Sequence, residues 1–273
     1  MSVAVTLLYV PADRPERVAK AFTLGADVVI VDLEDAVASG SKRAARESLP
    51  QLLASRDDQC VQVRVNAIDT PYAAADLAMV ASLATDVEVR LPKVESPQTI
   101  EAACRSLGAD RPIHALIETA VGVERAFDIA SYGRPVESIS LGEADLRSAL
   151  GVSNDQGLEW ARGRIIVAAA AAGLPAPSQS PFMNVRDLEG LAETSRAGRA
   201  YGFVGRSAIH PAQLAPIRGA YRPHEDEVRN ARATLDRLAG QSGGVDVLDD
   251  GSFIDPAMVD AARRIVELER LTR

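Results

Sequence analysis

The stretch "VTLLYVPADRPERVAKAFTLGADVVIVD", residues 5–32, places one short apolar run on each side of a segment of helical length. The runs at 5–10 and 27–32 are short and rich in Val, Ile and Leu, which favours buried strands. The segment between them, 14–24, has the length and period of an amphipathic helix. Apolar strands that alternate with helices predict a parallel sheet covered on both faces.

This alternation continues along the chain. Eight apolar runs are expected to form strands, at 5–10, 27–32, 60–66, 86–92, 113–118, 136–141, 175–179 and 202–209. Helical segments are expected between them at 14–24, 41–54, 72–82, 96–107, 121–130, 161–172 and 185–200. Eight such units predict an α/β fold of the (β/α)8 TIM-barrel type. A doubly wound sheet fits less well, because the first turn has no glycine-rich nucleotide-binding pattern.

The pattern changes after His210–Pro211. Residues 222–240 have the composition of a polar, charged helix, and 241–251 form a connector rich in Gly and Asp. Residues 252–270 turn at Asp255–Pro256 and enter a last amphipathic helix. We therefore predict a catalytic barrel domain over 1–220 and a C-terminal helical extension, or lid, over 221–273.

Composition excludes several classes of protein. The 273 residues carry a net charge of −8 and only 4% aromatics, which argues against a nucleic-acid partner. An apolar run long enough for a transmembrane helix is missing, and the N-terminus does not resemble a secretory signal. The two cysteines, Cys60 and Cys104, form no CxxC pair, so neither a disulfide framework nor a zinc site is expected. A cytoplasmic location without a membrane partner is the expectation.

Polar residues recur where the predicted strands end, and catalytic groups of such barrels lie at these ends. They are Asp32, Glu34, Asp35, Arg64, Asn66, Lys93, Glu95, Glu118, Glu143, Asp145 and His210. Taken singly, each has a simpler explanation. Glu118 and Asp145 suit the first turns of the helices that follow them, and Arg64 suits an ordinary ion pair. Taken together, they predict one site at the barrel mouth.

The mixture of side chains suggests a chemistry. Two carboxylates from different strands suit Mg²⁺, which combines a few carboxylates with water and substrate oxygens. No cluster of His and Cys competes for Zn²⁺. An arginine nearby can bind a carboxylate through two parallel hydrogen bonds. A metal ion beside an arginine is suited to hold a 2-oxo acid and to stabilise an enolate.

Seven ordered blocks carry a resemblance to a known family. They are residues 7–47, "VRVN" at 63–66, "LPKVES" at 91–96, "ALIETAVGV" at 115–123, "LGEADL" at 141–146, "IHPAQL" at 209–214 and "GSFIDPAMV" at 251–259. The chain resembles the citrate lyase beta subunit and its free-standing relatives in the HpcH/HpaI aldolase family, which includes malyl-CoA and citramalyl-CoA lyases. This resemblance covers nearly the whole chain and implies a (β/α)8 barrel that assembles as a homotrimer or a dimer of trimers.

The resemblance also implies roles for individual residues. It implies Glu118 and Asp145 as ligands of Mg²⁺, with Mn²⁺ as an alternative ion, and Arg64 as the residue that binds the oxo-acid carboxylate and acts in catalysis. Around the substrate it implies Glu34, Asp35 and Lys93, and for the phosphates of CoA, Arg14 and Lys20. A solvated helix face is the simpler explanation for Arg14 and Lys20.

Two further positions bear on the resemblance. Asp255 corresponds to an acid that acts over the active site of a neighbouring subunit, although Asp255–Pro256 also suits the start of a helix. Arg206 stands where many relatives carry lysine, which leaves its role open.

The expected reaction is Mg²⁺-dependent cleavage of a carbon–carbon bond in malyl-CoA, citramalyl-CoA, citryl-CoA or a similar 3-hydroxyacyl thioester. The products are an acyl-CoA and a 2-oxo acid. Alternatives are a malate-synthase-like condensation with thioester hydrolysis, a pyruvate aldolase acting without CoA, and a beta subunit that acts only within a larger lyase complex. The sequence leaves open the oxo acid and the choice between free CoA and an acyl-carrier protein.

Overall fold

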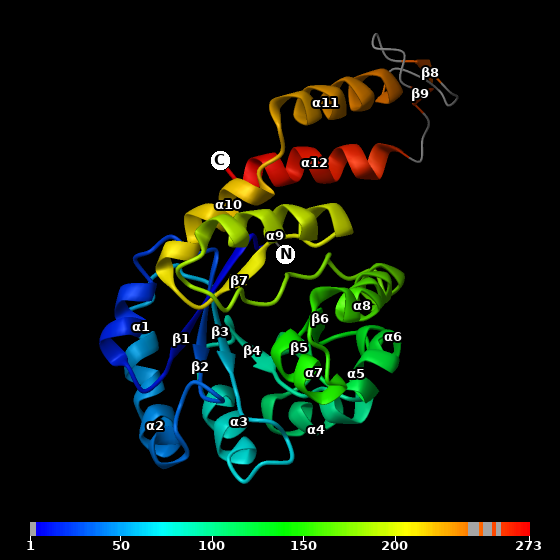
Figure 1. Cartoon of the computed structure of the whole chain (residues 1–273). Coiled ribbons are helices and arrows are strands. Elements are labelled where there is room, and N and C mark those ends of the chain that lie inside the picture. Colours follow the sequence, from blue (N-terminus) through cyan, green and yellow to red (C-terminus); the bar gives the residue numbers. More distant parts are fainter. Residues whose placement is uncertain (1–3, 240–245, 248–252, 255–257) are drawn as a thin grey trace. The chain divides into compact units, whose positions relative to one another are not determined.

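The computed structural model describes residues 4–239, 246–247, 253–254 and 258–273 (Figure 1). The chain divides into two compact units, Met1–Ile217 and Arg218–Arg273. Within the described residues, no helix combines the length and the apolar character that a membrane span requires. Asp255 lies outside the described residues.

The first unit is built on a sheet of seven strands in the order β6-β5-β4-β3-β2-β1-β7. The strands are β1 (Thr6–Pro11), β2 (Val28–Asp32), β3 (Val61–Arg64), β4 (Val87–Leu91), β5 (Ile113–Ile117), β6 (Val136–Leu141) and β7 (Arg206–Ala208). All six neighbouring pairs are parallel. The predicted α/β class with a parallel sheet is confirmed.

The eighth strand expected at 175–179 is reduced to one isolated parallel bridge between Gln179 and Arg206. The Gln179 N–H donates to the Gly205 carbonyl and the Gln179 carbonyl accepts from Ser207, each at 3.0 Å. Pro175 and Pro177 lie in the same segment and have no N–H to donate, so a longer ladder cannot form there.

The far edge of the sheet meets this segment through a side chain. Ser180 Oγ donates a hydrogen bond to the carbonyl of Leu141, the last residue of β6. The same oxygen accepts from the N–H of Glu143 at 3.2 Å. A serine hydroxyl thus joins β6 to the segment beside β7, where a backbone ladder would join two strands of a closed barrel.

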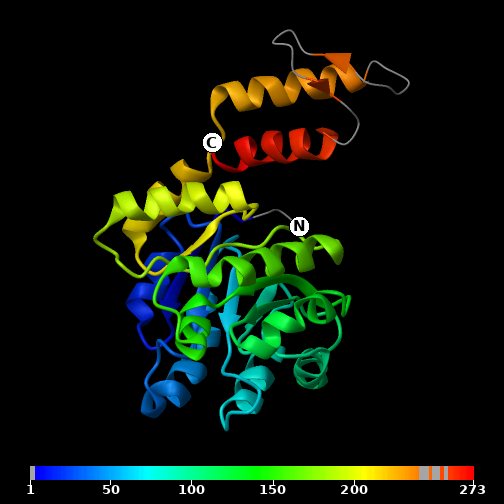
Figure 2. The same cartoon turned by 45° about the vertical axis from the view of Figure 1, so that its right-hand side comes forward.

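Residues 15–221 contain ten α-helices. They are α1 (Pro15–Ala21), α2 (Lys42–Leu53), α3 (Ala73–Ala81), α4 (Pro97–Leu107), α5 (Ala120–Glu124), α6 (Ala126–Ala130), α7 (Glu143–Leu150), α8 (Glu159–Ala171), α9 (Leu188–Tyr201) and α10 (Leu214–Tyr221). Figures 1 and 2 show α1, α2, α3, α4, α6 and α8 following one another around the strands. The single helix predicted at 121–130 divides at Arg125 into α5 and α6.

Local sequence explains where helices start and stop. Helix α4 begins at Pro97, whose fixed φ suits the first helical position. It ends at Gly108, whose φ of 82° is readily adopted only by glycine. The side chain of Asp187 caps α9 by accepting a hydrogen bond from the N–H of Gly190 at 2.9 Å.

The two faces of the strands differ in chemistry. Val29, Val63 and Val89 are fully buried toward the helices, which contribute buried residues such as Leu49 and Ile100. Alternate residues of the same strands point the other way; those of β3 and β4 are polar, whereas Val28 and Ile30 of β2 pack with Leu7 of β1 in a small apolar cluster. In the register of β3 with β4 these inward pairs are Gln62 with Glu88 and Arg64 with Arg90. The larger apolar core therefore lies between the sheet and the helices, while the inner side of the sheet is apolar at β1 and β2 and polar at β3 and β4.

The second unit contains α11 (Glu225–Ala239) and α12 (Val259–Leu271), which confirms the two helices expected there. The two helices lie side by side (Figures 1 and 2), and Arg232 forms an ion pair with Glu269 at 3.3 Å. Two short strands, β8 (Asp246–Val247) and β9 (Phe253–Ile254), form an antiparallel pair between them. The stretch expected to be only a connector therefore contributes a strand.

Candidate active site

A cavity of about 690 Å³ opens at the C-terminal ends of the strands in the first unit. It is lined by residues that follow or end five different strands, among them Asp32, Arg64, Glu118, Asp145 and Ile209. Active sites of parallel α/β folds lie at this end of the sheet, and the volume suits a small-molecule ligand. This cavity is therefore the candidate active site.

Arg64 is held by a carboxylate of the neighbouring strand. Its Nε donates to Asp32 Oδ1 at 2.7 Å and its Nη2 to Asp32 Oδ2 at 2.5 Å. Burial lowers the pKa of the guanidinium, but the hydrogen bonds and the charge of Asp32 raise it by more, so the pKa of Arg64 lies above its ordinary value. The ring of Tyr9 lies 5.1 Å below the guanidinium carbon. Arg64 is thus a fixed cation in the cavity wall.

Two more carboxylates face the outer edge of this guanidinium. Arg64 Nη1 lies 3.0 Å from Glu34 Oε2 and 3.7 Å from Asp35 Oδ2. Glu34 is buried, and burial raises its pKa to about 7 although Arg64 opposes this effect. The close approach to Arg64 is not aligned as a hydrogen bond, so Glu34 Oε2 is buried without a hydrogen-bond donor among the described residues. The structure places both Glu34 and Asp35 beside Arg64, and their contact with substrate stays a prediction.

Glu118 follows β5 directly and turns into the cavity. Thr119, not Glu118, caps α5, because Thr119 Oγ1 accepts from the N–H of Gly122 at 3.1 Å. A Cβ on Gly142 would lie 2.4 Å from Glu118 Oε2, so only glycine permits this approach. Burial, followed by the charges of Glu34 and Asp145, raises the pKa of Glu118 to about 8. The capping explanation for Glu118 is therefore wrong.

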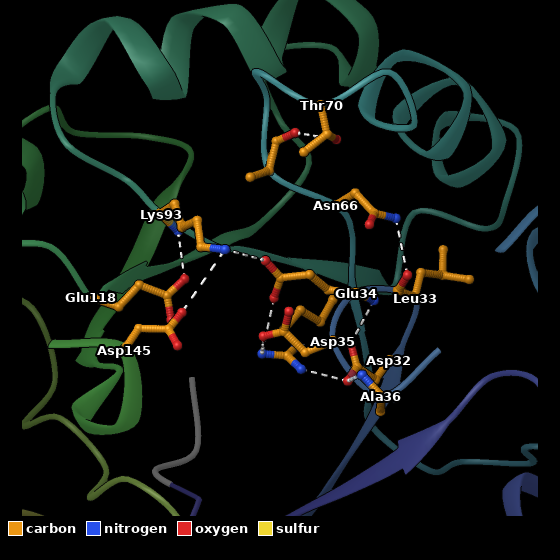
Figure 3. Close-up of polar contacts among 12 residues, drawn as sticks. Asp32, Leu33, Glu34, Asp35, Ala36, Asn66, Thr70, Lys93, Glu118 and Asp145 are labelled. Carbon is orange, nitrogen blue, oxygen red and sulfur yellow. Dashed lines mark hydrogen bonds and ion pairs between the residues drawn. The ribbon is translucent and has the colours of Figure 1, made fainter. Parts of the chain in front are cut away.

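Lys93 connects the carboxylates. Its N–H donates to Glu118 Oε1 at 2.9 Å, while its Nζ lies 3.6 Å from Glu34 Oε1 and 3.9 Å from Asp145 Oδ2 (Figure 3). Its φ of 51° is in the left-handed region, which costs a non-glycine residue about 1 kcal/mol. This strained conformation directs the backbone donor and the ammonium of one residue toward different carboxylates.

The carboxylates of Glu118 and Asp145 lie close together in Figure 3, in keeping with the charge of Asp145 raising the pKa of Glu118. Asp145 belongs to the first turn of α7 and its side chain is 46% exposed, so it also has access to solvent. In the described part of the chain, no three His, Cys, Asp or Glu side chains form a complete metal cage. Two carboxylates with open positions for water and substrate fit Mg²⁺.

A buried lysine that sequence reasoning missed supports the loop after β2. Lys42 Nζ donates to the carbonyls of Leu33 at 2.9 Å and Glu34 at 2.5 Å, and to Asn66 Oδ1 at 2.7 Å. Asn66 in turn donates to the Leu33 carbonyl at 3.0 Å (Figure 3). These bonds fix the backbone that carries Glu34. Lys42 occurs at the start of a helix in the sequence, where nothing distinguishes it from a solvated lysine.

Three other predicted residues stand apart from this cluster. Arg14 is exposed beside Asp13, 3.8 Å away, and Lys20 is exposed in the last turn of α1. Neither lines the cavity, so their contact with CoA stays a prediction. Arg206 is buried and lines the cavity, with its Nε donating to the Ser180 carbonyl at 3.0 Å. Arg206 therefore connects β7 to the segment that meets β6.

The C-terminal edge of this parallel sheet carries several carboxylates, an arginine and a lysine. Such a set of side chains can bind a metal ion and a carboxylate ligand next to each other. The model of the HpcH/HpaI aldolase/citrate lyase family matches residues 5–211. The chain belongs to this family, which confirms the resemblance drawn from the seven blocks.

Individual relatives match over almost their whole length. A citrate lyase subunit beta-like protein of Mycobacterium tuberculosis is 37% identical over 268 residues, covering 95% of this chain and 93% of the relative. A (3S)-malyl-CoA thioesterase of Cereibacter sphaeroides is 33% identical over 267 residues, covering 95% and 92%. The crystal structure of CitE from Mycobacterium tuberculosis with magnesium, acetoacetate and coenzyme A has a TM-score of 0.82 and 34% identity, covering 98% of each chain.

Proposed function

We propose that this protein is a Mg²⁺-dependent carbon–carbon lyase acting on a 3-hydroxyacyl-CoA thioester such as malyl-CoA, citramalyl-CoA or citryl-CoA. The products are an acyl-CoA and a 2-oxo acid. One observation carries the proposal: Asp35, Arg64, Glu118 and Asp145, from four different strand ends, line one cavity, and Glu34 lies 3.0 Å from Arg64. The solved relative that holds magnesium, acetoacetate and coenzyme A supports the same classes of ligand for this chain.

Glu118 and Asp145 would hold the metal ion. When bound, Mg²⁺ withdraws electron density from the substrate oxygens and offsets the charge of the carboxylates. The raised pKa of Glu118 supports this assignment, because a carboxylate crowded by other carboxylates gains most from a cation. Glu34, held near Arg64 and Lys93, would orient the substrate or a water molecule.

Arg64 binds the substrate carboxylate in the proposed mechanism, and Asp32 keeps the guanidinium plane fixed. A base accepts the proton of the substrate hydroxyl, whose oxygen becomes the carbonyl oxygen of the oxo acid. The bond from the hydroxyl-bearing carbon to the α-carbon of the thioester breaks, and its electron pair forms the thioester enolate. Asp255 of a neighbouring subunit then delivers a proton to the α-carbon.

This mechanism requires an assembly and a complete barrel. We propose that the sheet closes into a (β/α)8 barrel, which the Ser180 hydrogen bonds to β6 and the Gln179 bridge to β7 support. We further propose a homotrimer or a dimer of trimers in the cytoplasm, since Asp255 must reach a second copy. Arg14 and Lys20 are the proposed contacts of the CoA phosphates.

Thioester hydrolysis is a second candidate, favoured by the 33% identity to the (3S)-malyl-CoA thioesterase. The two reactions differ in their products. Cleavage yields an acyl-CoA and a 2-oxo acid, whereas hydrolysis yields free CoA and a hydroxy acid. A thiol reagent therefore detects only hydrolysis, and a carbonyl reagent detects only cleavage.

The test uses the purified full chain with malyl-CoA, citramalyl-CoA and citryl-CoA, with and without Mg²⁺. We expect release of a 2-oxo acid only when Mg²⁺ is present. Glu118→Gln should weaken Mg²⁺ binding, measured by calorimetry, by at least about tenfold, because it removes one charged ligand. Glu124→Gln, an exposed residue of α5, is the matched control and should leave binding unchanged. If Glu118→Gln kept both Mg²⁺ binding and cleavage, the assignment of Glu118 as a metal ligand would be contradicted.

A further inference from the structure

Tyr9 is a cavity residue that the proposed mechanism does not use. It lies on β1 and is paired in register with Ile30 of β2, two residues before Asp32. Its ring packs against the small apolar cluster of Leu7, Val28 and Ile30, so Tyr9 points to the inner side of the sheet. It also lines the candidate active site. Tyr9 therefore lies one inward-facing position deeper in the cavity than Asp32.

The ring of Tyr9 is held in place, but its hydroxyl is not. The guanidinium carbon of Arg64 lies 5.1 Å from the centre of the ring, which is typical of a cation–π contact. Within the described residues, the hydroxyl of Tyr9 has no hydrogen-bond partner. A tyrosine hydroxyl inside a protein usually finds such a partner. A fixed ring with a free hydroxyl suits a side chain that contacts a ligand in the cavity.

Two arginines lie on the same inner side of the sheet as Tyr9. Arg64 covers its ring, and Arg90 of β4 is buried and lines the same cavity. Arg90 is fixed by neutral groups, because its Nε donates to Gln62 Oε1 and its Nη1 to Ser140 Oγ, each at 3.0 Å.

These surroundings decide the chemical character of the Tyr9 hydroxyl. Burial raises its pKa above the ordinary value, although the charges of Arg90 and Arg64 oppose this effect. The hydroxyl therefore keeps its proton at neutral pH and can donate a hydrogen bond to an anionic oxygen.

The depth of Tyr9 indicates which part of a substrate it meets. The proposed metal ligands, Glu118 and Asp145, follow β5 and β6 at the mouth of the cavity. The CoA moiety is the largest part of a thioester substrate and extends from this mouth toward solvent. The acid that binds the metal ion and Arg64 is then the innermost part of the substrate, and Tyr9 lies beneath it.

We infer that Tyr9 is a further substrate-binding residue, whose hydroxyl donates a hydrogen bond to an oxygen of the oxo-acid half. This inference rests on the proposed lyase function and adds a residue to its site. Phenylalanine at position 9 would keep the ring against Arg64 and remove only the donor. Tyr9→Phe therefore isolates the contribution of the hydroxyl.

Calorimetric titration of the full chain with pyruvate and with oxaloacetate, each in the presence of Mg²⁺, tests the inference. We expect Tyr9→Phe to weaken binding of the acid that the wild-type protein binds more tightly by at least about tenfold, the effect of one hydrogen bond to a charged group. The affinity for acetyl-CoA should be unchanged, because its CoA moiety extends away from Tyr9. Tyr132→Phe removes a hydroxyl outside the cavity and is the matched control, which should change neither affinity.

The outcomes separate this inference from the proposed function. An unchanged oxo-acid affinity in Tyr9→Phe, or an equal loss of oxo-acid and acetyl-CoA binding, would overturn the inference and leave the lyase function standing. Failure of the wild-type protein to bind either acid with Mg²⁺ would overturn both. Urea denaturation of Tyr9→Phe should give the wild-type free energy of unfolding, since the ring stays against Arg64. A clear fall would assign the hydroxyl to the fold and not to the substrate.

Discussion

The ion pair of Arg64 with Asp32 should be one of the main determinants of stability in the first unit. The Asp32 side chain is 1% exposed and that of Arg64 12%. Both carboxylate oxygens are also occupied on their second sides, because Oδ1 accepts from the N–H of Glu34 at 2.8 Å and Oδ2 from that of Ala36 at 3.2 Å. Asp32→Asn removes the charge and places an amide donor against other donors.

The size of the stability loss in Asp32→Asn follows from the burial of the ion pair. Removing one partner of a buried ion pair costs about 3–5 kcal/mol, since the other charge stays buried. Glu34 and Asp35 still face Arg64 at 3.0 and 3.7 Å and offset part of this loss. We therefore expect Asp32→Asn to lower the free energy of unfolding by about 3 kcal/mol.

Urea denaturation at neutral pH measures this change, and the chain offers a matched control. Asp86 accepts two hydrogen bonds of 2.7 Å from Arg56, but its side chain is 69% exposed. Asp86→Asn should cost less than about 1 kcal/mol, as exposed ion pairs do. A loss in Asp32→Asn no larger than that in Asp86→Asn would refute the reasoning that burial sets the energy of the pair.

Three further predictions concern the carboxylates and their support. Gly142→Ala places a Cβ 2.4 Å from Glu118 Oε2, so calorimetry should show that Mg²⁺ binds about tenfold more weakly or worse. Gly163→Ala is the control, because a Cβ at this position inside α8 meets nothing within 4 Å. This control should raise the free energy of unfolding by about 0.5–1 kcal/mol. Without Mg²⁺, the pKa values of Glu118 and Glu34 in the folded protein are about 8 and about 7, whereas in the unfolded chain both groups have the ordinary value of 4.5. The folded protein therefore keeps protons that the unfolded chain has already released. These groups should therefore make stability fall as pH rises from about 4.5 to 8, and Mg²⁺ should raise the melting temperature more at pH 8 than at pH 6; an equal shift at both would contradict this. Lys42→Met leaves Asn66 Oδ1 without its donor and removes one donor from the carbonyls of Leu33 and Glu34, which still accept from the Asn66 amide and from the N–H of Val37. Urea denaturation should show a loss of about 2 kcal/mol, whereas a loss below about 0.5 kcal/mol would show that water replaces the ammonium.

Much of the fold could be predicted because apolar periodicity is a local property. The strands around Val29, Val63 and Val89 follow from runs that are apolar on the side of the helices. The eighth strand could not be placed in the same way, because its apolar run is interrupted by prolines. A proline does not alter the hydrophobic pattern, yet it removes the donors on which a ladder depends.

Some residues of the candidate site could likewise be predicted from the sequence, and others could not. Acids and bases directly after buried strands, such as Glu118 and Arg64, could be found because parallel strands end at one edge of a sheet. Lys42 and Arg90 could not. A lysine that opens a helix and an arginine inside an apolar run look the same in sequence whether they meet water or buried groups.

The sequence by itself determined where seven of the eight expected strands lie, which polar residues end or follow them, and the family to which the chain belongs. Only the tertiary structure decided which of these residues meet. Asp32 and Arg64 are paired across 32 positions by strand register, and Gly142 admits Glu118 because β5 and β6 lie side by side. Register, burial and the partners left to each charge depend on all strands at once, so no local pattern encodes them.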